Sequence, residues 1–555
     1  MSAPEDKTGC PTTARARRIV NIYNFIRAYE PRYPAVSRDV LLETTARQIR
    51  GVREHGLPAT FALQYDALID SRYQELLRRE LPGNCEIGAW WEIVQPQVEK
   101  AGLGWRGRYP WDWHAHVGFS PGYTPNEREK LVDVYMRDFK AIFGFFPATA
   151  GSWFIDAHTL RYMSEKYGIV ASCNCKDQIG TDGYTLWGGY WNQGYYPSKR
   201  NAYIPAQEAD AQIPVPIFRM LGSDPIYQYE SGLGTARQGL ISLEPVSRAG
   251  GANPEWVSWF LQGMTEEPCL AFAYIQAGQE NAFTWEKMDP AYTRQLACIA
   301  QLAAEGRITV ETLKQTGTWF RARFPLTPST AVTATQDWKH EERKTVWYNS
   351  RFYRMNLLWE PAGFRVRDIQ MFDQDRPEPN LDSPLTSTAC QYDALPVVDG
   401  FYWSKPGELA GIRLVRRDGA TRQIVEVGPP KIRETGTASL SICCPLKPAG
   451  KLEIQCTEGQ AAFHLIGIPD PAAYTFVLTW SRNSRVPFDR IEPTALVCTH
   501  QGFPYRVTCS QGHFERLSPS GLDEDSAFGE AGILIVPEDQ VVRINFTQRN
   551  RFPVP

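Results

Sequence analysis

The chain has 555 residues, 43% of them hydrophobic and 22% charged, a composition typical of globular proteins and unlike that of disordered chains. Lysine and arginine total 59 and aspartate and glutamate total 62, so the net charge of −3 argues against a nucleic-acid partner. The sequence has no apolar run long enough to cross a bilayer, and residues 1–18 lack the apolar core of a secretory signal. Twelve cysteines are too few for a disulfide scaffold, so we expect buried thiols and a cytoplasmic protein.

Eight short apolar runs, rich in β-branched and aromatic residues, predict buried parallel strands in the first part of the chain. In chain order they are 18–27, 58–65, 85–92, 148–155, 169–175, 213–221, 238–246 and 269–276. Helical stretches separate most of these runs, with caps expected at Ser37, Thr124 and Asp156. The alternation predicts the α/β class and a (β/α)8-like barrel, or a seven-stranded one because residues 213–269 are irregular.

The rest of the chain has a different texture, without helical patterns. Alternating runs such as 473–480, separated by Gly, Pro and Asp, predict the strands of a β-sandwich region that follows the barrel. We therefore expect a barrel domain over residues 1–325 and β-rich accessory structure over residues 326–555. The polar, proline-rich stretch 374–398 is expected to be a loop, or a linker that divides the β-rich part into two units.

In a parallel barrel, side chains at the carboxyl ends of the strands form the active site. Five acidic residues occupy such positions: Glu92, Asp177, Asp224, Glu244 and Glu280. A buried carboxylate is costly unless it is paired or used, so we expect at least two of the five to line one cleft. Each of them also suits an ion pair at the barrel rim or a helix cap.

The segment after the third predicted strand concentrates ionisable side chains, which are Arg106, Arg108, Asp112, His114 and His116. Three interpretations of the histidines stay open: a metal pair with Asp112 as third ligand, a general acid or base, or hydrogen-bonded rings packed among tryptophans. The two arginines can hold a substrate carboxylate through paired hydrogen bonds, or can cover apolar surface with their stems.

Aromatic residues make up 12% of the chain, and they are densest between the fifth and sixth predicted strands. Residues 182–203 hold seven of them: Tyr184, Trp187, Tyr190, Trp191, Tyr195, Tyr196 and Tyr203. Aromatic faces beside hydrogen-bond donors suit sugar rings, so the segment predicts a sugar platform. A self-packed lid or a subunit interface is the alternative, which leaves a homodimer open.

Two segments resemble the polysaccharide deacetylase superfamily. Residues 85–90 (CEIGAW) resemble its His-Glu-Ile-Gly-x-His segment, and residues 147–153 with the helix after them resemble its Arg-Pro-Pro-x-Gly segment. The resemblance covers residues 18–175 and implies a deacetylase-like barrel. Related barrels include inverting exo-sialidases that use a His and an Asp, to which the segment around His114 is loosely similar.

The positions that the resemblance assigns to the metal ligands carry other residues. The paired aspartates fall on Asn24 and Phe25, and the metal-binding histidines fall on Trp90 and Val94. The resemblance therefore implies a deacetylase-like barrel that has lost its metal site and carries its chemistry elsewhere.

Together these features predict an enzyme, a carbohydrate-active hydrolase that is first of all a glycoside hydrolase removing a terminal sugar, with an acidic sugar such as sialic acid included. Glycosidic cleavage needs an acid and a base or nucleophile, and the candidate catalytic residues are Glu244, Asp177, His114 and Glu280. The candidate substrate-binding residues are Glu92, Arg108, Asp112, His116, Asp182, Trp187, Trp191, Tyr195, Arg200, Gln276 and Asn349.

Two other functions remain as alternatives. One is a metal-dependent carbohydrate deacetylase whose site has moved to Asp112, His114 and His116. The other is a carbohydrate-binding protein without catalysis. The main interpretation calls for no metal or cofactor, and it expects carbohydrate, rather than nucleic acid or membrane, as the partner.

Overall fold

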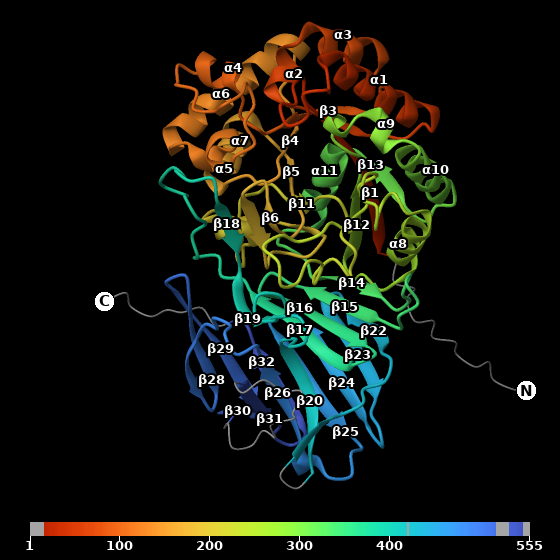
Figure 1. The fold of residues 1–555 in the computed structure, drawn as a ribbon, viewed down its shortest axis with the longest axis vertical. Helices are drawn as coiled ribbons and strands as arrows, with labels where there is room; N and C mark the ends of the chain where they lie inside the picture. Colours follow the sequence, from red (N-terminus) through yellow and green to blue (C-terminus); the bar gives the residue numbers. More distant parts are fainter. Residues whose placement is uncertain (1–15, 419–420, 518–531, 548–555) are drawn as a thin grey trace, which may run out of the picture.

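The computed structural model describes residues 16–418, 421–517 and 532–547. Helices surround a parallel sheet in the first part of the chain, and antiparallel sheets stack below it in the second part (Figure 1). Within these ranges no helix is both long and apolar enough to cross a membrane. All cysteines in the same ranges are free, and most are buried.

Seven parallel strands form the curved sheet of the first region. They are β1 (Arg17–Ile26), β2 (Thr60–Leu63), β3 (Glu86–Trp90), β4 (Thr149–Gly151), β5 (Ala171–Asn174), β11 (Ile217–Arg219) and β12 (Phe272–Ala277). Their order in space is β12-β1-β2-β3-β4-β5-β11, with β8 (Gly194–Tyr195) antiparallel beyond β11 and β13 (Thr309–Glu311) paired with β1. As far as the structure is described, β8 and β12 do not pair, so the sheet stays open and matches the seven-stranded alternative.

The predicted strand at 238–246 is wrong. Its residues form an irregular segment with a single bridge from Ser242 to Ser223, and the Ile241 amide donates to the Gln228 side chain instead of to a strand. Where the sheet is open between β8 and β12, the side-chain amide of Gln193, just before β8, binds the backbone of β12. It accepts from the Tyr274 amide at 2.8 Å and donates to the Tyr274 carbonyl at 3.3 Å, and so replaces one step of strand pairing.

Helices cover the outside of the sheet. They are α1 (Arg38–Glu54), α2 (Tyr65–Ile69), α3 (Ser71–Glu80), α4 (Gln95–Lys100), α5 (Ala115–Gly118), α6 (Pro125–Phe143), α7 (Ala157–Tyr167), α8 (Pro254–Glu266), α9 (Trp285–Met288), α10 (Ala291–Ala304) and α11 (Leu313–Arg323). The three predicted caps are confirmed: Ser37, Thr124 and Asp156 each accept a backbone N–H in the first turn of α1, α6 and α7.

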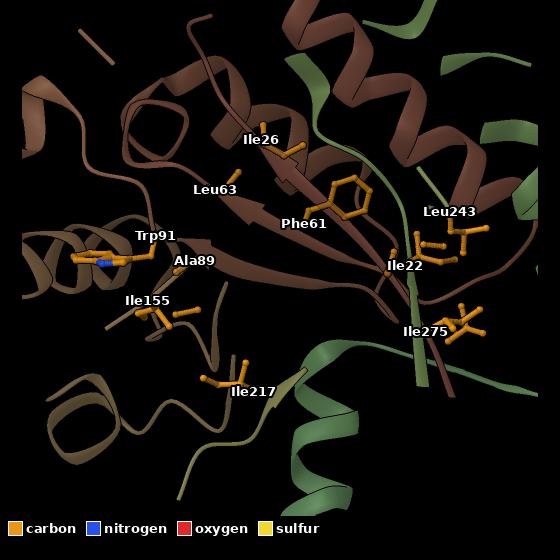
Figure 2. Packing of buried hydrophobic residues seen from close by; sticks show 14 of the residues in the cluster. Ile22, Ile26, Phe61, Leu63, Ala89, Trp91, Ile155, Ile217, Leu243 and Ile275 are labelled. Atoms are coloured by element: carbon orange, nitrogen blue, oxygen red, sulfur yellow. The ribbon is translucent and has the colours of Figure 1, made fainter. Parts of the chain in front are cut away.

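The two faces of the barrel strands bury different side chains. Ile22, Phe61 and Ile275 belong to the large cluster of aliphatic and aromatic residues under the helices (Figure 2). Phe25 and Trp90 belong to a second, aromatic-rich cluster. Successive strand residues point to opposite faces, which is why one strand feeds both clusters. Each fully buried large apolar side chain stabilises the fold by about 1.5–3 kcal/mol.

The aromatic segment after β5 folds into short strands. These are β6 (Gln178–Thr181), β7 (Tyr184–Trp187), β9 (Pro197–Ser198) and β10 (Asn201–Pro205). Strand β7 pairs with β6 and, from the other side, with a strand of the second region. The segment therefore lies between the two regions of the molecule.

Two antiparallel sheets make up most of the second region. The first contains β14 (Thr330–Ala334), β15 (Lys344–Asn349), β16 (Tyr353–Glu360), β17 (Gly363–Met371), β19 (Leu395–Asp399), β20 (Gly411–Asp418), β21 (Thr421–Ile424), β26 (Tyr474–Thr479), β30 (His513–Arg516) and β31 (Gly532–Val536). The second contains β22 (Lys431–Gly436), β23 (Ser439–Pro445), β24 (Lys451–Thr457), β25 (Gln460–Ile466), β27 (Phe488–Glu492), β28 (Ala495–His500), β29 (Phe503–Gln511) and β32 (Val541–Asn545). Residues of both sheets, such as Leu357 and Ile454, belong to one hydrophobic cluster.

The stretch 374–398, expected to be a loop or linker, returns to the barrel region instead. Its strand β18 (Cys390–Asp393) pairs in parallel with β7, and β19 joins the first antiparallel sheet. The Glu378 carboxylate accepts the backbone N–H groups of Ala157 and Ala202, each at 2.8 Å. The two regions are thus tied together by chain that sequence patterns assign to a break. The boundary predicted at residue 325 remains a prediction.

Candidate active site at the barrel mouth

The carboxyl ends of three barrel strands bring one arginine and two carboxyl groups together. Arg27 follows β1, Glu92 follows β3, and Glu280 follows β12. The Arg27 guanidinium donates to both Glu92 carboxylate oxygens, from Nε at 2.9 Å and from Nη2 at 2.7 Å, and it also pairs with Glu280. All three side chains are at most 3% exposed, so this is a buried ionic cluster at the barrel mouth.

A second arginine extends the mouth cluster toward solvent. Arg32 pairs with Glu30 at 2.8 Å, with Asp182 at 3.2 Å and with Glu280 at 3.7 Å. Its side chain is 19% exposed and that of Asp182 is 32% exposed. The predicted binding residue Asp182 therefore lies at the mouth, where the buried carboxyl of Glu280 comes closest to water through Arg32.

The electrostatics of the mouth favour a protonated Glu280 near neutral pH. Burial raises the pKa of Glu280 to about 7, and the attraction of Arg27 and Arg32 only partly offsets it. Repulsion from Glu30 and Glu92 acts in the same direction as burial. A carboxyl group with a pKa near the working pH can both give and take a proton, which is what general acid–base catalysis requires.

In the segment predicted to be rich in ionisable groups, Trp111 lies against this cluster, and we call it the roof residue. The Trp111 ring is 1% exposed and lies with its centroid 4.2 Å from the Arg27 guanidinium and 4.9 Å from that of Arg32. A cation over an aromatic face is stabilised electrostatically, so Trp111 helps to hold both arginines in place.

Asp112, His114 and Arg108 bind one another within the same segment. Arg108 donates to Asp112 from Nε to Oδ2 at 2.9 Å and from Nη2 to Oδ1 at 3.1 Å, and His114 Nδ1 also lies 2.7 Å from Oδ1. Burial would raise the pKa of Asp112, but these hydrogen bonds hold it well below its ordinary value. Burial and the neighbouring His114 and Arg106 lower the pKa of His116.

This arrangement does not fit the relocated metal site. The Asp112 oxygens already accept hydrogen bonds from a guanidinium, an imidazole and backbone N–H groups. In the described ranges, no group of three or more His, Cys, Asp or Glu side chains is arranged to hold a metal ion. Of the three interpretations, the hydrogen-bonded histidine among tryptophans describes His114 best, since its ring stacks on Trp113 at 5.4 Å.

The positions that the deacetylase resemblance assigns to metal ligands are also unfit for a cation. The Phe25 and Trp90 rings stack at 4.2 Å, and the Trp153 ring meets both of them edge-on. The Asn24 side-chain oxygen accepts from Gln48 and Tyr292, at 3.2 and 3.0 Å. An aromatic cluster thus fills this part of the barrel interior, and an indole N–H offers a hydrogen-bond donor but no ligand.

Glu244 and Asp224 lie in separate, occupied environments. Glu244 pairs with the buried Lys176 at 3.4 Å and accepts from the Ser242 hydroxyl at 2.7 Å. Asp224 accepts from the indole N–H groups of Trp256 and Trp338, at 2.7 and 3.1 Å, and from two backbone N–H groups. Neither contacts the Arg27 cluster, so of the five strand-end acids only Glu92 and Glu280 share a partner.

Asp177 is a structural residue rather than a free acid. It pairs with Arg219 at 2.8 Å and with Arg354, and it accepts from the Tyr203 hydroxyl at 2.6 Å. Burial would raise the pKa of Asp177, but Arg354 and Arg219 outweigh it and lower the pKa below its ordinary value. Because Arg354 lies on β16 and also pairs with Asp368, this cluster joins the barrel to the second region. The catalytic role of Asp177 stays a prediction, and these ion pairs do not favour it.

The aromatic segment 182–203 is buried instead of forming an open platform. Trp187, Trp191 and Tyr195 are at most 2% exposed. Trp191 stacks on Trp347 at 3.7 Å with the rings nearly parallel, and Asn349 binds the Trp191 backbone on both its N–H and its C=O. These residues pack the junction of the two regions, and their sugar-binding role stays a prediction that their burial does not favour.

Two other predicted binding residues contribute little to the mouth. Arg200 is exposed at the turn between β9 and β10, where its backbone binds Ser198 and Glu378. Gln276 is buried on β12 and donates to the Tyr274 hydroxyl at 3.3 Å. The residues that sequence reasoning missed are Arg27, Arg32 and Trp111. The strand-end rule finds Arg27 once basic as well as acidic residues are considered after β1.

No protein-family model and no curated protein matches this sequence. Among solved structures, a candidate glycoside hydrolase/deacetylase from Parabacteroides distasonis is 17% identical with a TM-score of 0.49, over 69% of this chain and 92% of that one. A candidate polysaccharide deacetylase from Mycobacterium smegmatis is 14% identical with a TM-score of 0.36, over 58% and 95%. An acetyl xylan esterase from Clostridium thermocellum is 11% identical with a TM-score of 0.25, over 54% and 91%.

Two of the three have deacetylase in their names, and the third is named an esterase.

Proposed function

We propose that this protein is a carbohydrate-active hydrolase whose acid–base residue is Glu280 at the barrel mouth. The observation that carries the proposal is the convergence of Glu92 and Glu280, from the ends of β3 and β12, on the guanidinium of Arg27. In parallel barrels this end of the sheet is where catalytic side chains gather.

The environment of Glu280 supports this role. Glu92 accepts both hydrogen bonds of the bidentate Arg27 guanidinium. Glu280, with a pKa of about 7, carries a proton over part of the physiological range. A carboxyl group whose environment raises its pKa is suited to the general-acid role in a hydrolase.

Two kinds of bond at a sugar remain candidates, each with its own support. Cleavage of an acetyl group is favoured by the two deacetylase-like segments, which form β3 and β4 and lie side by side in the sheet. Cleavage of a glycosidic bond is favoured by the carboxyl pair, since that reaction uses two carboxyl groups. The metal-dependent route has no support in the ligand sets described above, so the proposed proton transfers run through Glu280 and water.

Two reporter panels test the proposal on the full chain: acetylated sugars read by acetate release, and nitrophenyl glycosides that include a sialoside. We expect hydrolysis in one panel, a turnover loss of about 100- to 10,000-fold in Glu280→Gln, and little change in the exposed control Glu75→Gln. Hydrolysis that survives in Glu280→Gln, or no hydrolysis in either panel, would overturn the assignment.

A further inference from the structure

The mouth carries an exposed group of aromatic rings beside the roof residue Trp111. The centroid of the Trp113 ring lies 6.3 Å from that of the Trp111 ring, and the two planes are tilted by 50°. The Tyr109 ring is parallel to Trp113 within 10° at 6.0 Å, and the His114 ring follows at 5.4 Å and 22°. Three roughly parallel rings therefore continue from the roof of the Glu280 cluster.

These rings are open to solvent, unlike those of the segment 182–203. Tyr109 is 40% exposed, Trp113 is half-buried, and the His114 side chain is 23% exposed. The partly exposed Arg32 and Asp182 lie at the same mouth and offer hydrogen-bond donors and acceptors. Planar rings bordered by polar groups are the surface that a sugar ring needs, because its C–H face stacks while its hydroxyl groups require partners.

The geometry of the rings is held by contacts within the segment. The Arg108 guanidinium lies 4.8 Å from the Trp113 ring centroid and 5.5 Å from that of Tyr109, while Asp112 fixes the guanidinium itself. The Trp105 indole donates to the Tyr109 carbonyl at 3.0 Å. A surface that is arranged before binding loses less conformational entropy when a ligand arrives.

We infer that Tyr109 and Trp113 form the sugar platform of this protein and stack on a neutral sugar ring next to the bond that is hydrolysed. The inference rests on the proposed function, because its reacting group is Glu280. The platform is connected to Glu280 through neighbouring side chains. Trp113 neighbours Trp111, and Trp111 lies against the arginines that pair with Glu280.

Binding of methyl glycosides of glucose, galactose, xylose and N-acetylglucosamine, read by tryptophan fluorescence and confirmed by calorimetry, tests the platform. We expect at least one of the four to bind. Tyr109→Ala and Trp113→Ala should each weaken its binding about 3- to 10-fold, the value of one stacked ring. The matched control is Phe145→Ala, an exposed ring at 50% that follows α6 and precedes β4.

The same titration in Glu280→Gln separates the two proposals. Glycoside binding that persists in Glu280→Gln and weakens in Tyr109→Ala supports the platform, whatever the outcome for turnover. Binding that is unchanged in both platform variants, or that weakens equally in Phe145→Ala, would overturn it. The absence of binding by all four glycosides would overturn it as well.

Discussion

Two buried clusters in this molecule combine arginines with carboxyl groups, and they differ in charge balance. At the junction of the two regions, Arg219 and Arg354 face Asp177 and Asp368, two cations against two anions. At the mouth, Arg27 and Arg32 face four carboxyl groups, those of Glu30, Glu92, Asp182 and Glu280.

The two clusters differ in which carboxyl group can still take up and release a proton near neutral pH. At the junction, Arg354 and Arg219 lower the pKa of Asp177 despite burial, and the carboxylate is held in ion pairs with both. At the mouth, burial outweighs the attraction of Arg27 and Arg32, and Glu30 and Glu92 add repulsion, so the pKa of Glu280 is raised to about 7. Perturbed acids cluster at functional sites for this reason.

The largest effect should come from breaking the junction. Asp177→Asn leaves Arg219 and Arg354 with an uncompensated buried charge, so we expect the free energy of unfolding to fall by about 3–5 kcal/mol. Urea denaturation measures it, with the exposed Asp39→Asn as a control that changes stability by less than about 1 kcal/mol. A loss in Asp177→Asn as small as that of the control would contradict a large contribution of the junction cluster to stability.

The Glu280 carboxyl group at the mouth should make the free energy of unfolding fall as the pH rises. The folded pKa of Glu280 is raised from 4.5 to about 7, so its contribution to stability is fully present below pH 4.5 and is lost as pH rises through 7. Relative to Glu280→Gln, the natural chain should lose about 3 kcal/mol of stability over that interval. A difference between the two proteins that stays constant from pH 4.5 to 8 contradicts the raised pKa.

The smallest effect concerns the buried aromatic rings of the junction. Trp191→Phe keeps part of the stack on Trp347 but leaves a small cavity, so we expect a loss of about 1–2 kcal/mol in stability. KM for the substrate should not change, because this ring does not reach solvent. An increase in KM together with unchanged stability would restore the sugar-platform interpretation of residues 182–203.

Local patterns carried much of the fold. The short apolar runs predicted seven strands of the sheet, and the cap residues Thr124 and Asp156 predicted where α6 and α7 begin. The run 238–246 has the composition of a strand, but its backbone is satisfied by side chains such as Gln228, a tertiary contact that no local pattern contains. The stretch 374–398 was misjudged for the same reason, because its partners lie in the barrel.

The site was only half predictable. The strand-end rule selected Glu92 and Glu280 correctly as neighbours, but it could not separate them from Asp177, whose partner Arg354 lies 177 residues further along the chain. Aromatic density selected the segment of Trp191, whereas exposure, which density does not report, favours Tyr109 and Trp113.

The central claim is that Glu280 holds a proton near neutral pH, and infrared difference titration measures it directly. Subtracting the spectra of Glu280→Gln from those of the natural chain isolates the carboxylic C=O band of Glu280. We predict that this band disappears with a midpoint near pH 7. A midpoint below pH 5, the ordinary range of an exposed glutamate, would contradict the raised pKa of Glu280 and its acid–base role.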